Sequence, residues 1–268
     1  MNRRSSEILM SLIESGNKGL NITEIAELYK VTEKTVRNDI EDINYFLKKN
    51  RLNQIALLGN GHVRFEGSAH DVKLSINENF LQYYRLEKSE RQLIVSLLLA
   101  LSTGYVTISS LAKKVYVSRS TLLNDLKSIK VFLLKNDLHV SSYPNKGLLV
   151  EGSEYKRRIL AAKIVSGCLN EKTSLVFRKA NFNPYEVFFL NNDHKKELKE
   201  IIEKLIIEVT NLYNIQLTDI SFKLLSYYLL ISVIRIKSGY RIKEKSVYVN
   251  RWKQIVKELS QRISQYCD

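Results

Sequence analysis

The stretch Val31-Thr-Glu-Lys-Thr-Val-Arg-Asn-Asp-Ile40 recurs 86 positions downstream as Val117-Ser-Arg-Ser-Thr-Leu-Leu-Asn-Asp-Leu126. When the comparison extends to Leu52 and Leu138, ten of the 22 aligned positions are identical. Each copy combines a short helix, a turn with a β-branched residue, and a second helix that begins at Thr or Ser, which is the pattern of a helix-turn-helix. The sequence therefore predicts two helix-turn-helix elements, a motif typical of DNA-binding proteins.

Around the first copy the periodicity predicts helices over residues 5–15, 22–29 and 33–47. Asn21 and Thr32 are the expected N-caps of the second and third helices. The third helix has one apolar stripe at helical spacing, made of Val36, Ile40, Ile43 and Leu47. We expect this stripe to be buried, so that the polar first turn faces outward.

A β-hairpin follows each helix-turn-helix. Gly59-Asn60-Gly61 joins the expected strands 54–58 and 63–66, and Asn-Gly is a strong hairpin signal. After the second copy, the hairpin over residues 139–152 turns at Pro144-Asn145-Lys146-Gly147. Three helices and a hairpin make a winged helix. For the second, we expect helices over residues 89–101 and 108–115 and a third from the cap Ser118 to about Lys135.

The predicted fold class is mainly α, with two tandem winged helix-turn-helix domains followed by part of a helical bundle. The domains are expected at residues 1–67 and 89–153, joined by a linker at 68–88, with a helical domain at 154–268. Helix candidates in the last domain are residues 156–167, 192–213, 222–238 and 246–266.

The chain has 268 residues and a formal net charge of +14, which favours a polyanionic partner. The excess is +5 over residues 1–153 and +9 over residues 154–268, so charge alone does not locate the DNA. Cys168 and Cys267 have no ligand or redox spacing and are expected to be free thiols. The N-terminus does not resemble a signal peptide, and the longest apolar run is too short for a membrane span. These features predict a cytoplasmic protein.

The candidate DNA contacts lie on the two third helices and on the two hairpins. Lys and Arg can contact phosphate or guanine, and Asn can pair with adenine. The candidates are Thr32, Lys34, Thr35, Arg37, Asn38 and Arg64 in the first copy, and Ser118, Arg119, Ser120, Thr121, Asn124 and Lys146 in the second. Asp39 and Asp125 are expected to be structural, because phosphates would repel them.

The second recognition helix is expected to be less basic, because it contains Leu122-Leu123 and Asp125. Its alternative role is to pack against a neighbouring protein domain. The four histidines, His62, His70, His139 and His194, have no partners at metal-ligand spacing. With no phosphate loop and no nucleophile motif, we expect no metal, no cofactor and no enzymatic activity.

The order of these motifs resembles the BglG-family regulators of sugar operons, of the mannitol and lichenan activator type. Residues 147–158 look like that family's join between its second, Mga-like winged helix and a phosphotransferase-system regulation domain (PRD). Residues 222–239 are similar to a central helix of that domain. The resemblance implies a transcriptional regulator, an activator of a carbohydrate phosphotransferase-system operon. It would bind operator DNA as a homodimer and be controlled through its PRD by phosphotransferase-system proteins.

The family resemblance also implies a phosphorylated histidine in that central helix, where this chain has Tyr228. Tyrosine cannot form phosphohistidine, and the nearest alternative, His194, is expected in a loop. No phosphoacceptor is therefore assigned. Family members are longer, so the resemblance also implies that the chain is C-terminally truncated.

Three alternative functions remain at this stage. One is a virulence-type regulator of the same architecture that has lost phosphohistidine control. Another is an RNA-binding antiterminator, which the three-helix N-terminal pattern disfavours because such proteins begin with a small β domain. The third is a protein-interaction scaffold whose winged helices do not contact nucleic acid.

Overall fold

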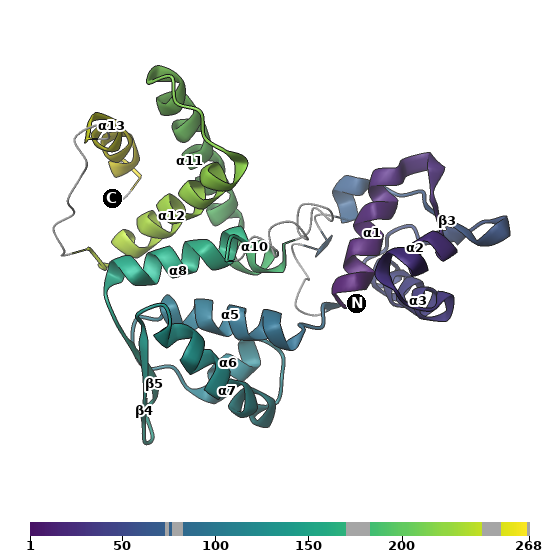
Figure 1. Cartoon of the computed structure of the whole chain (residues 1–268), viewed down its shortest axis with the longest axis horizontal. Coiled ribbons are helices and arrows are strands. Elements are labelled where there is room, and N and C mark those ends of the chain that lie inside the picture. The colour runs from purple at the N-terminus through teal and green to yellow at the C-terminus, as the bar shows by residue number, and fades with distance from the viewer. Residues whose placement is uncertain (73–74, 77–82, 170–182, 243–252, 267–268) are drawn as a thin grey trace. The chain divides into compact units, whose positions relative to one another are not determined.

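The computed structural model describes residues 1–72, 75–76, 83–169, 183–242 and 253–266. The described residues are mainly α-helical, with small antiparallel sheets, as the sequence predicts (Figure 1). Two compact units can be distinguished. Unit 1 comprises Met1–Arg91 and Glu171–Phe188, and unit 2 comprises Gln92–Asn170 and Phe189–Asp268.

The first helix-turn-helix lies in unit 1. Its helices are α1 (Arg3–Ser15), α2 (Ile22–Tyr29) and α3 (Glu33–Lys49). The apolar stripe predicted for α3 is confirmed, because all four of its side chains are buried: Val36, Ile40, Ile43 and Leu47. Burial of each such side chain stabilises the fold by about 1.5–3 kcal/mol. Together they determine which face of α3 is turned outward.

The first wing is a three-stranded sheet, one strand more than predicted. Its strands β2 (Ile55–Leu57) and β3 (His62–Phe65) are joined through a 3₁₀ turn at Gly59–Gly61. The short strand β1 (Leu20–Asn21) pairs with β3. This pairing requires close approach at Gly19, where a Cβ atom would lie 2.5 Å from the Val63 carbonyl oxygen and where φ is +65°.

Unit 2 contains the second winged helix. Its helices α6 (Ile108–Lys114) and α7 (Arg119–Leu134) follow α5 (Lys88–Ala100), and its wing consists of β4 (His139–Tyr143) and β5 (Gly147–Glu151). A single antiparallel bridge between Val106 and Leu148 stands where β1 pairs with β3 in unit 1. A Cβ atom on Gly147 would lie 2.6 Å from the Val106 carbonyl oxygen, so the two wings share this close approach.

A helical segment completes unit 2. It contains α8 (Glu154–Ser166), α11 (Asp193–Leu212), α12 (Asp219–Lys237) and α13 (Lys253–Ser264). Helix α12 packs against α8 and α11, and α13 packs against α11 (Figure 1). The short helix α10 (Pro184–Phe189), which belongs to unit 1 up to Phe188, was not predicted. The first part of the helix expected at 246–266 lies outside the described residues.

The prediction that His194 lies in a loop is wrong. Asn192 caps α11 by accepting a hydrogen bond from the backbone N–H of Lys195, so His194 belongs to the first turn of that helix. Its side chain is exposed. No helix in the described part of the chain is long and apolar enough to cross a membrane.

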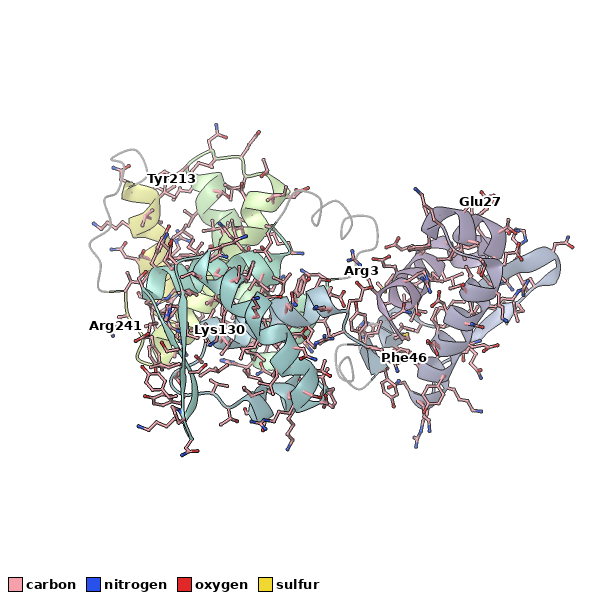
Figure 2. The ribbon with its side chains drawn as sticks, turned by 60° about the horizontal axis from the view of Figure 1, so that its bottom comes forward. Arg3, Glu27, Phe46, Lys130, Tyr213 and Arg241 are labelled. Carbon is pink, nitrogen blue, oxygen red and sulfur yellow. The ribbon has the colours of Figure 1, made fainter. Side chains whose placement is uncertain are left out.

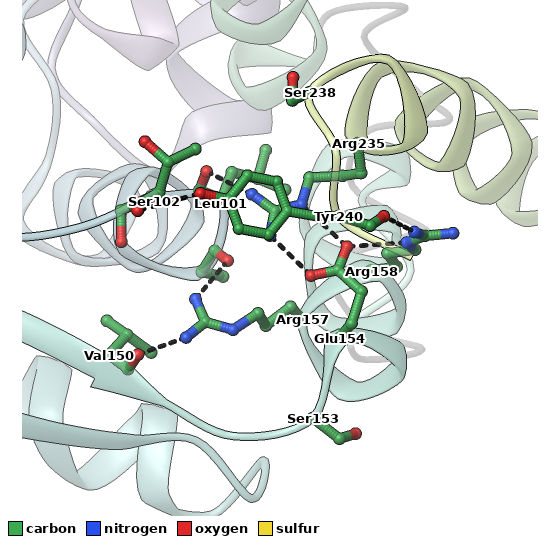
Figure 3. A network of polar contacts seen from close by, with 12 residues as sticks. Leu101, Ser102, Val150, Ser153, Glu154, Arg157, Arg158, Arg235, Ser238 and Tyr240 are labelled. Carbon is green, nitrogen blue, oxygen red and sulfur yellow. Dashed lines mark hydrogen bonds and ion pairs between the residues drawn. The ribbon is translucent and has the colours of Figure 1, made fainter. Parts of the chain in front are cut away.

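A cluster of charged side chains joins the start of α8 to the end of α12 (Figure 3). Arg235 binds both carboxylate oxygens of Glu154, with Nη2–Oε2 and Nε–Oε1 distances of 2.6 and 2.8 Å. Arg158 Nε donates to Glu154 Oε1 over 2.8 Å, and its Nη2 donates to the carbonyl of Tyr240 over 2.6 Å. Arg235 Nη1 also donates to the Leu101 carbonyl over 2.9 Å. The cluster around Glu154 therefore connects the start of α8, the end of α12 and the residues after α5.

Burial alone would raise the pKa of Glu154, but the hydrogen bonds from Arg235 and Arg158 outweigh it, so the pKa is lowered. A carboxyl group with a lowered folded-state pKa contributes stability above its unfolded-state pKa of about 4.3, and this contribution is lost as the pH falls through the folded-state pKa.

We expect Glu154→Gln to lower the free energy of unfolding by about 3 kcal/mol at pH 7, because it leaves two arginines without their carboxylate. The difference from the unsubstituted chain should shrink as the pH falls below about 4. Urea unfolding followed by circular dichroism at several pH values measures both effects. The control is Glu151→Gln, an exposed carboxylate on β5 whose loss should cost less than about 0.5 kcal/mol. Equal effects of the two substitutions would contradict the assignment.

Candidate nucleic-acid interface

The two helix-turn-helix elements have the same turn. Lys30 and Tyr116 occupy equivalent positions and adopt the left-handed conformation, with φ of 53° and 54°. The next residue in each copy closes the turn, since Val31 N–H donates to the Ala26 carbonyl over 2.9 Å and Val117 N–H donates to the Ala112 carbonyl over 3.0 Å. The first turns of α3 and α7 are therefore held in the same way.

The hydroxyl residues predicted as DNA contacts have a capping role in each copy. Thr32 Oγ1 accepts a hydrogen bond from the backbone N–H of Thr35 over 3.2 Å, and Ser118 Oγ accepts one from Thr121 over 3.1 Å. The hydroxyls within each pair also lie within hydrogen-bond distance, at 2.9 and 2.8 Å. Ser120 Oγ lies 2.8 Å from Ser118 Oγ. These contacts fix the start of each recognition helix.

The remaining predicted contacts on α3 and α7 are exposed: Lys34, Arg37, Asn38, Arg119 and Asn124. Arg37 makes a long ion pair with Glu33, 3.8 Å between Nη2 and Oε2, and both side chains are about half exposed. Asn38 and Asn124 are identical residues at equivalent places in the two copies. Within the described part of the chain, neither amide makes a hydrogen bond to another residue, so both can bind an external partner.

The residue after Asn38 has the opposite role. Asp39 is buried and receives a hydrogen bond of 2.5 Å from Arg4 Nε and one of 3.0 Å from Ser5 Oγ. It therefore ties α3 to α1. Asp125, its counterpart on α7, is also buried, at 2% exposure. The burial of both carboxylates confirms the prediction that they are structural.

The surface of α7 is more basic than predicted, because the buried Asp125 does not contribute to it. Between residues 119 and 130, α7 carries three cations, Arg119, Lys127 and Lys130, and no other carboxylate. Lys130, labelled in Figure 2, donates from Nζ to Ser142 Oγ of the wing over 2.9 Å. Between residues 33 and 42, by contrast, α3 exposes two cations and three carboxylates. The more favourable electrostatic surface for phosphate is therefore α7.

Lys127 and Lys130 were not among the predicted DNA contacts. Helical spacing supplies a signal for Lys127, which lies three residues after Asn124 and seven after Ser120 and so shares their face. Lys130 has no such signal, because its position depends on the contact with the second wing.

The two wings place their predicted basic residues differently. Arg64 is half-buried on β3 and forms an ion pair with Glu66, which follows the same strand. Lys146 is exposed at the turn of the second wing, with its Nζ 5.5 Å from the centre of the Tyr105 ring. Tyr105 in turn packs edge-on against Tyr143, at 5.3 Å between ring centres. Of these two cations, Lys146 is the more accessible to phosphate.

Comparison with known domains gives two matches. Residues 4–57 match a helix-turn-helix domain model, and residues 73–164 match the Mga helix-turn-helix domain. The first range contains α2 and α3, and the second contains α6, α7 and both strands of the second wing. These matches support DNA binding.

Two curated relatives align along most of the chain. The transcriptional regulator ManR of Bacillus subtilis (strain 168) is 29% identical over 241 residues, which cover 88% of this chain and 35% of ManR. The probable licABCH operon regulator of the same organism is 24% identical over 232 residues, which cover 86% of this chain and 34% of that protein. The chain spans about a third of the length of these relatives.

The chain therefore contains a helix-turn-helix domain and an Mga helix-turn-helix domain, and it is similar to these two regulators. The matched domains are helix-turn-helix domains and both relatives are named as regulators, so the comparisons agree with the expectation that the chain is not an enzyme. Within the described residues, no three His, Cys, Asp or Glu side chains gather in a way that could hold a metal ion.

Asn38 and Asp39 are neighbours, and substitution of each one distinguishes a role in DNA binding from a role in the stability of the fold. We expect Asp39→Ala to lower the free energy of unfolding by about 3 kcal/mol, because it leaves Arg4 without its buried partner. Asn38→Ala should change it by less than about 0.5 kcal/mol while weakening binding to DNA. Urea unfolding and a DNA titration of both variants measure this separation. A large loss of stability in Asn38→Ala would show that its amide is structural.

Glu33 on α3 offers a test of electrostatics. Its Oε1 accepts a hydrogen bond from Thr23 over 2.8 Å, which the amide oxygen of glutamine can also accept. We expect Glu33→Gln to increase affinity for duplex DNA about threefold, because it removes a negative charge near phosphate and releases Arg37. The control is Glu14→Gln, with the same charge change on α1. Titrations at two salt concentrations measure both, and equal gains would mean that only net charge matters.

Proposed function

We propose that this chain binds double-stranded operator DNA through both winged helices and regulates a carbohydrate phosphotransferase-system operon, as an activator. The observation that carries the proposal is the pair Asn38 and Asn124, at equivalent positions of two capped helices. Both amides are exposed and make no hydrogen bond to any residue that the structure describes. The two relatives, a transcriptional regulator and a probable operon regulator, support the same function.

In this proposal helices α3 and α7 contribute differently to DNA binding. Helix α3 reads bases with Asn38 and Arg37 and contacts phosphate with Lys34. Helix α7 contributes more to affinity, because Arg119, Lys127 and the wing residue Lys146 are cations without exposed acidic neighbours on that helix. Phosphate contacts give affinity that is independent of sequence, whereas base contacts give specificity. Thr32, Thr35, Ser118, Ser120 and Thr121 would act mainly by positioning the helix ends, and Arg64 by supporting the first wing.

We further propose the domain limits 1–67, 68–88, 89–153 and 154–268, with the last acting as the regulatory part. Operators read by helix-turn-helix proteins are commonly palindromic, which favours a homodimer. Phosphotransferase-system proteins are the proposed regulators of the helical part. Tyr228 is half-buried on α12 at the position of the expected phosphoacceptor, which favours the variant in which histidine phosphorylation has been lost there. His194, exposed on α11, is the remaining histidine candidate.

Selection of bound sites from a random duplex library tests the function directly. The chain should enrich a two-part motif, with half-sites spaced at about one helical turn of DNA. The triple variant Lys34→Ala/Arg37→Ala/Asn38→Ala should lose specificity in part of the motif, and its affinity should fall about 100-fold if each contact is worth about 1 kcal/mol. The corresponding variant on α7 is Arg119→Ala/Asn124→Ala/Lys127→Ala, which should mainly reduce the salt dependence of binding.

All six substituted side chains are partly or fully exposed, so the folded state should survive, and circular dichroism checks this. If both triple variants bind DNA as the unsubstituted chain does, the winged helices do not contact DNA, and the scaffold alternative is favoured. If single-stranded RNA is enriched over duplex DNA in a parallel selection, the antiterminator alternative is favoured.

A further inference from the structure

A cavity of about 400 Å³ lies in unit 2 between the second winged helix and the helical segment. Its walls come from residues 102–104 after α5, from the corner between β5 and α8, and from the end of α12 with Tyr240 and Arg241. None of its lining residues lies on α6 or α7. It is therefore separate from the proposed DNA-reading residues.

The lining contains more positive than negative charge. Glu154 is the one carboxylate among the described residues that line the cavity, and it is already bound by Arg235 and Arg158. Among the described residues, Arg157 donates only to backbone carbonyls, to Ala100 from Nη1 over 3.1 Å and to Val150 from Nη2 (Figure 3). In the part of the chain that the structure describes, Arg157 and Arg241 have no ion pair with a carboxylate. Two guanidinium charges therefore face the cavity without a counter-ion.

The half-buried position of Arg157 makes its unpaired charge unfavourable. Burial, together with the nearby positive charge of Arg235, lowers the pKa of Arg157. An anion in the cavity would relieve this cost. The start of α8 adds to the effect, because the N-terminal end of a helix carries a partial positive charge.

Comparison of the two winged helices indicates that the fold itself does not require an arginine here. Ser68 and Ser153 follow the two wings in the same way, and each accepts a hydrogen bond from the backbone N–H three residues later. Four residues after Ser68 stands Val72, which is fully buried, whereas four residues after Ser153 stands Arg157. The first copy thus has the same serine cap but an apolar side chain at this position.

We propose that this cavity binds a small phosphate monoester, with the phosphate held by Arg157 and Arg241. Guanidinium groups bind phosphate through paired hydrogen bonds, and a phosphate monoester carries about −1.5 to −2 charges at pH 7, close to the surplus of two. The volume lies within the range of about 300–1,000 Å³ that is usual for small-ligand sites. The carbon part of the ligand would lie toward Tyr240 and residues 102–104.

Isothermal titration calorimetry of the whole 268-residue chain without DNA tests the proposal. The probes are glycerol phosphate, inorganic phosphate and uncharged glycerol, in buffers matched for ionic strength with potassium chloride. We expect saturable binding of glycerol phosphate, weaker binding of inorganic phosphate and none of glycerol. Arg157→Gln and Arg241→Gln should each weaken glycerol phosphate binding about tenfold, the usual effect of losing one charge-assisted hydrogen bond.

Lys237→Gln is the matched control, because Lys237 is an exposed cation at the end of α12 that does not line the cavity. It removes one positive charge nearby and should leave binding unchanged. Arg241 is exposed, so its variant stays informative even if Arg157→Gln fails to fold. Absence of saturable phosphate binding, or equal weakening by Lys237→Gln, would overturn the proposal. The proposal would also be overturned if the unsubstituted chain bound no glycerol phosphate while the two arginine variants weakened binding to random-sequence duplex DNA. In that case the cavity would face the DNA backbone.

Discussion

The left-handed residue in each helix-turn-helix turn is the constraint on which the rest of the candidate interface depends. Lys30 and Tyr116 are neither glycine nor asparagine, so each adopts this conformation at a cost of about 1–2 kcal/mol. The hydrogen bond from the following valine to an alanine carbonyl closes the turn and offsets part of that cost. Because this geometry fixes the direction of the next helix, the buried stripe points inward and the capped first turn points outward.

Several of the identities between the two copies have structural roles in the fold. Asn50 and Asn136 each donate from the side-chain amide to the carbonyl four residues earlier, Phe46 and Phe132, and so complete the ends of α3 and α7. Lys49 and Lys135 lie at the same ends, where a cation complements the helix dipole. Asn38 and Asn124 are different, because no described residue forms a hydrogen bond with their side-chain amides. An identity without a structural role is the stronger sign of a shared external partner.

The sequence predicted the features that have a period or a strong local signal. The stripe on α3, the caps Thr32 and Ser118, and both hairpins are confirmed for that reason. It did not predict β1, because two residues show no alternation and their pairing with β3 depends on the folded wing. Helix α10 has only six residues and was likewise missed. The basic surface of α7 was underestimated because the burial of Asp125 depends on tertiary packing, which spacing along one helix does not describe.

The ion cluster around Glu154 sets unit 2 apart from unit 1. Buried ion pairs often stabilise a protein less than apolar side chains of the same size would, since removing charges from water costs free energy. The first winged helix has the buried, apolar Val72 at the position of Arg157, so an apolar side chain is compatible with the segment that follows the wing. In the second winged helix, by contrast, the stability of the junction with α8 depends on the geometry of charged groups and on the ions near them. Arg235 binds Glu154 on α8 and the Leu101 carbonyl after α5, so displacement of its guanidinium would disturb both contacts. The end of α12 is therefore linked to the second winged helix through this cluster, and a bound anion would change the net charge of the cluster.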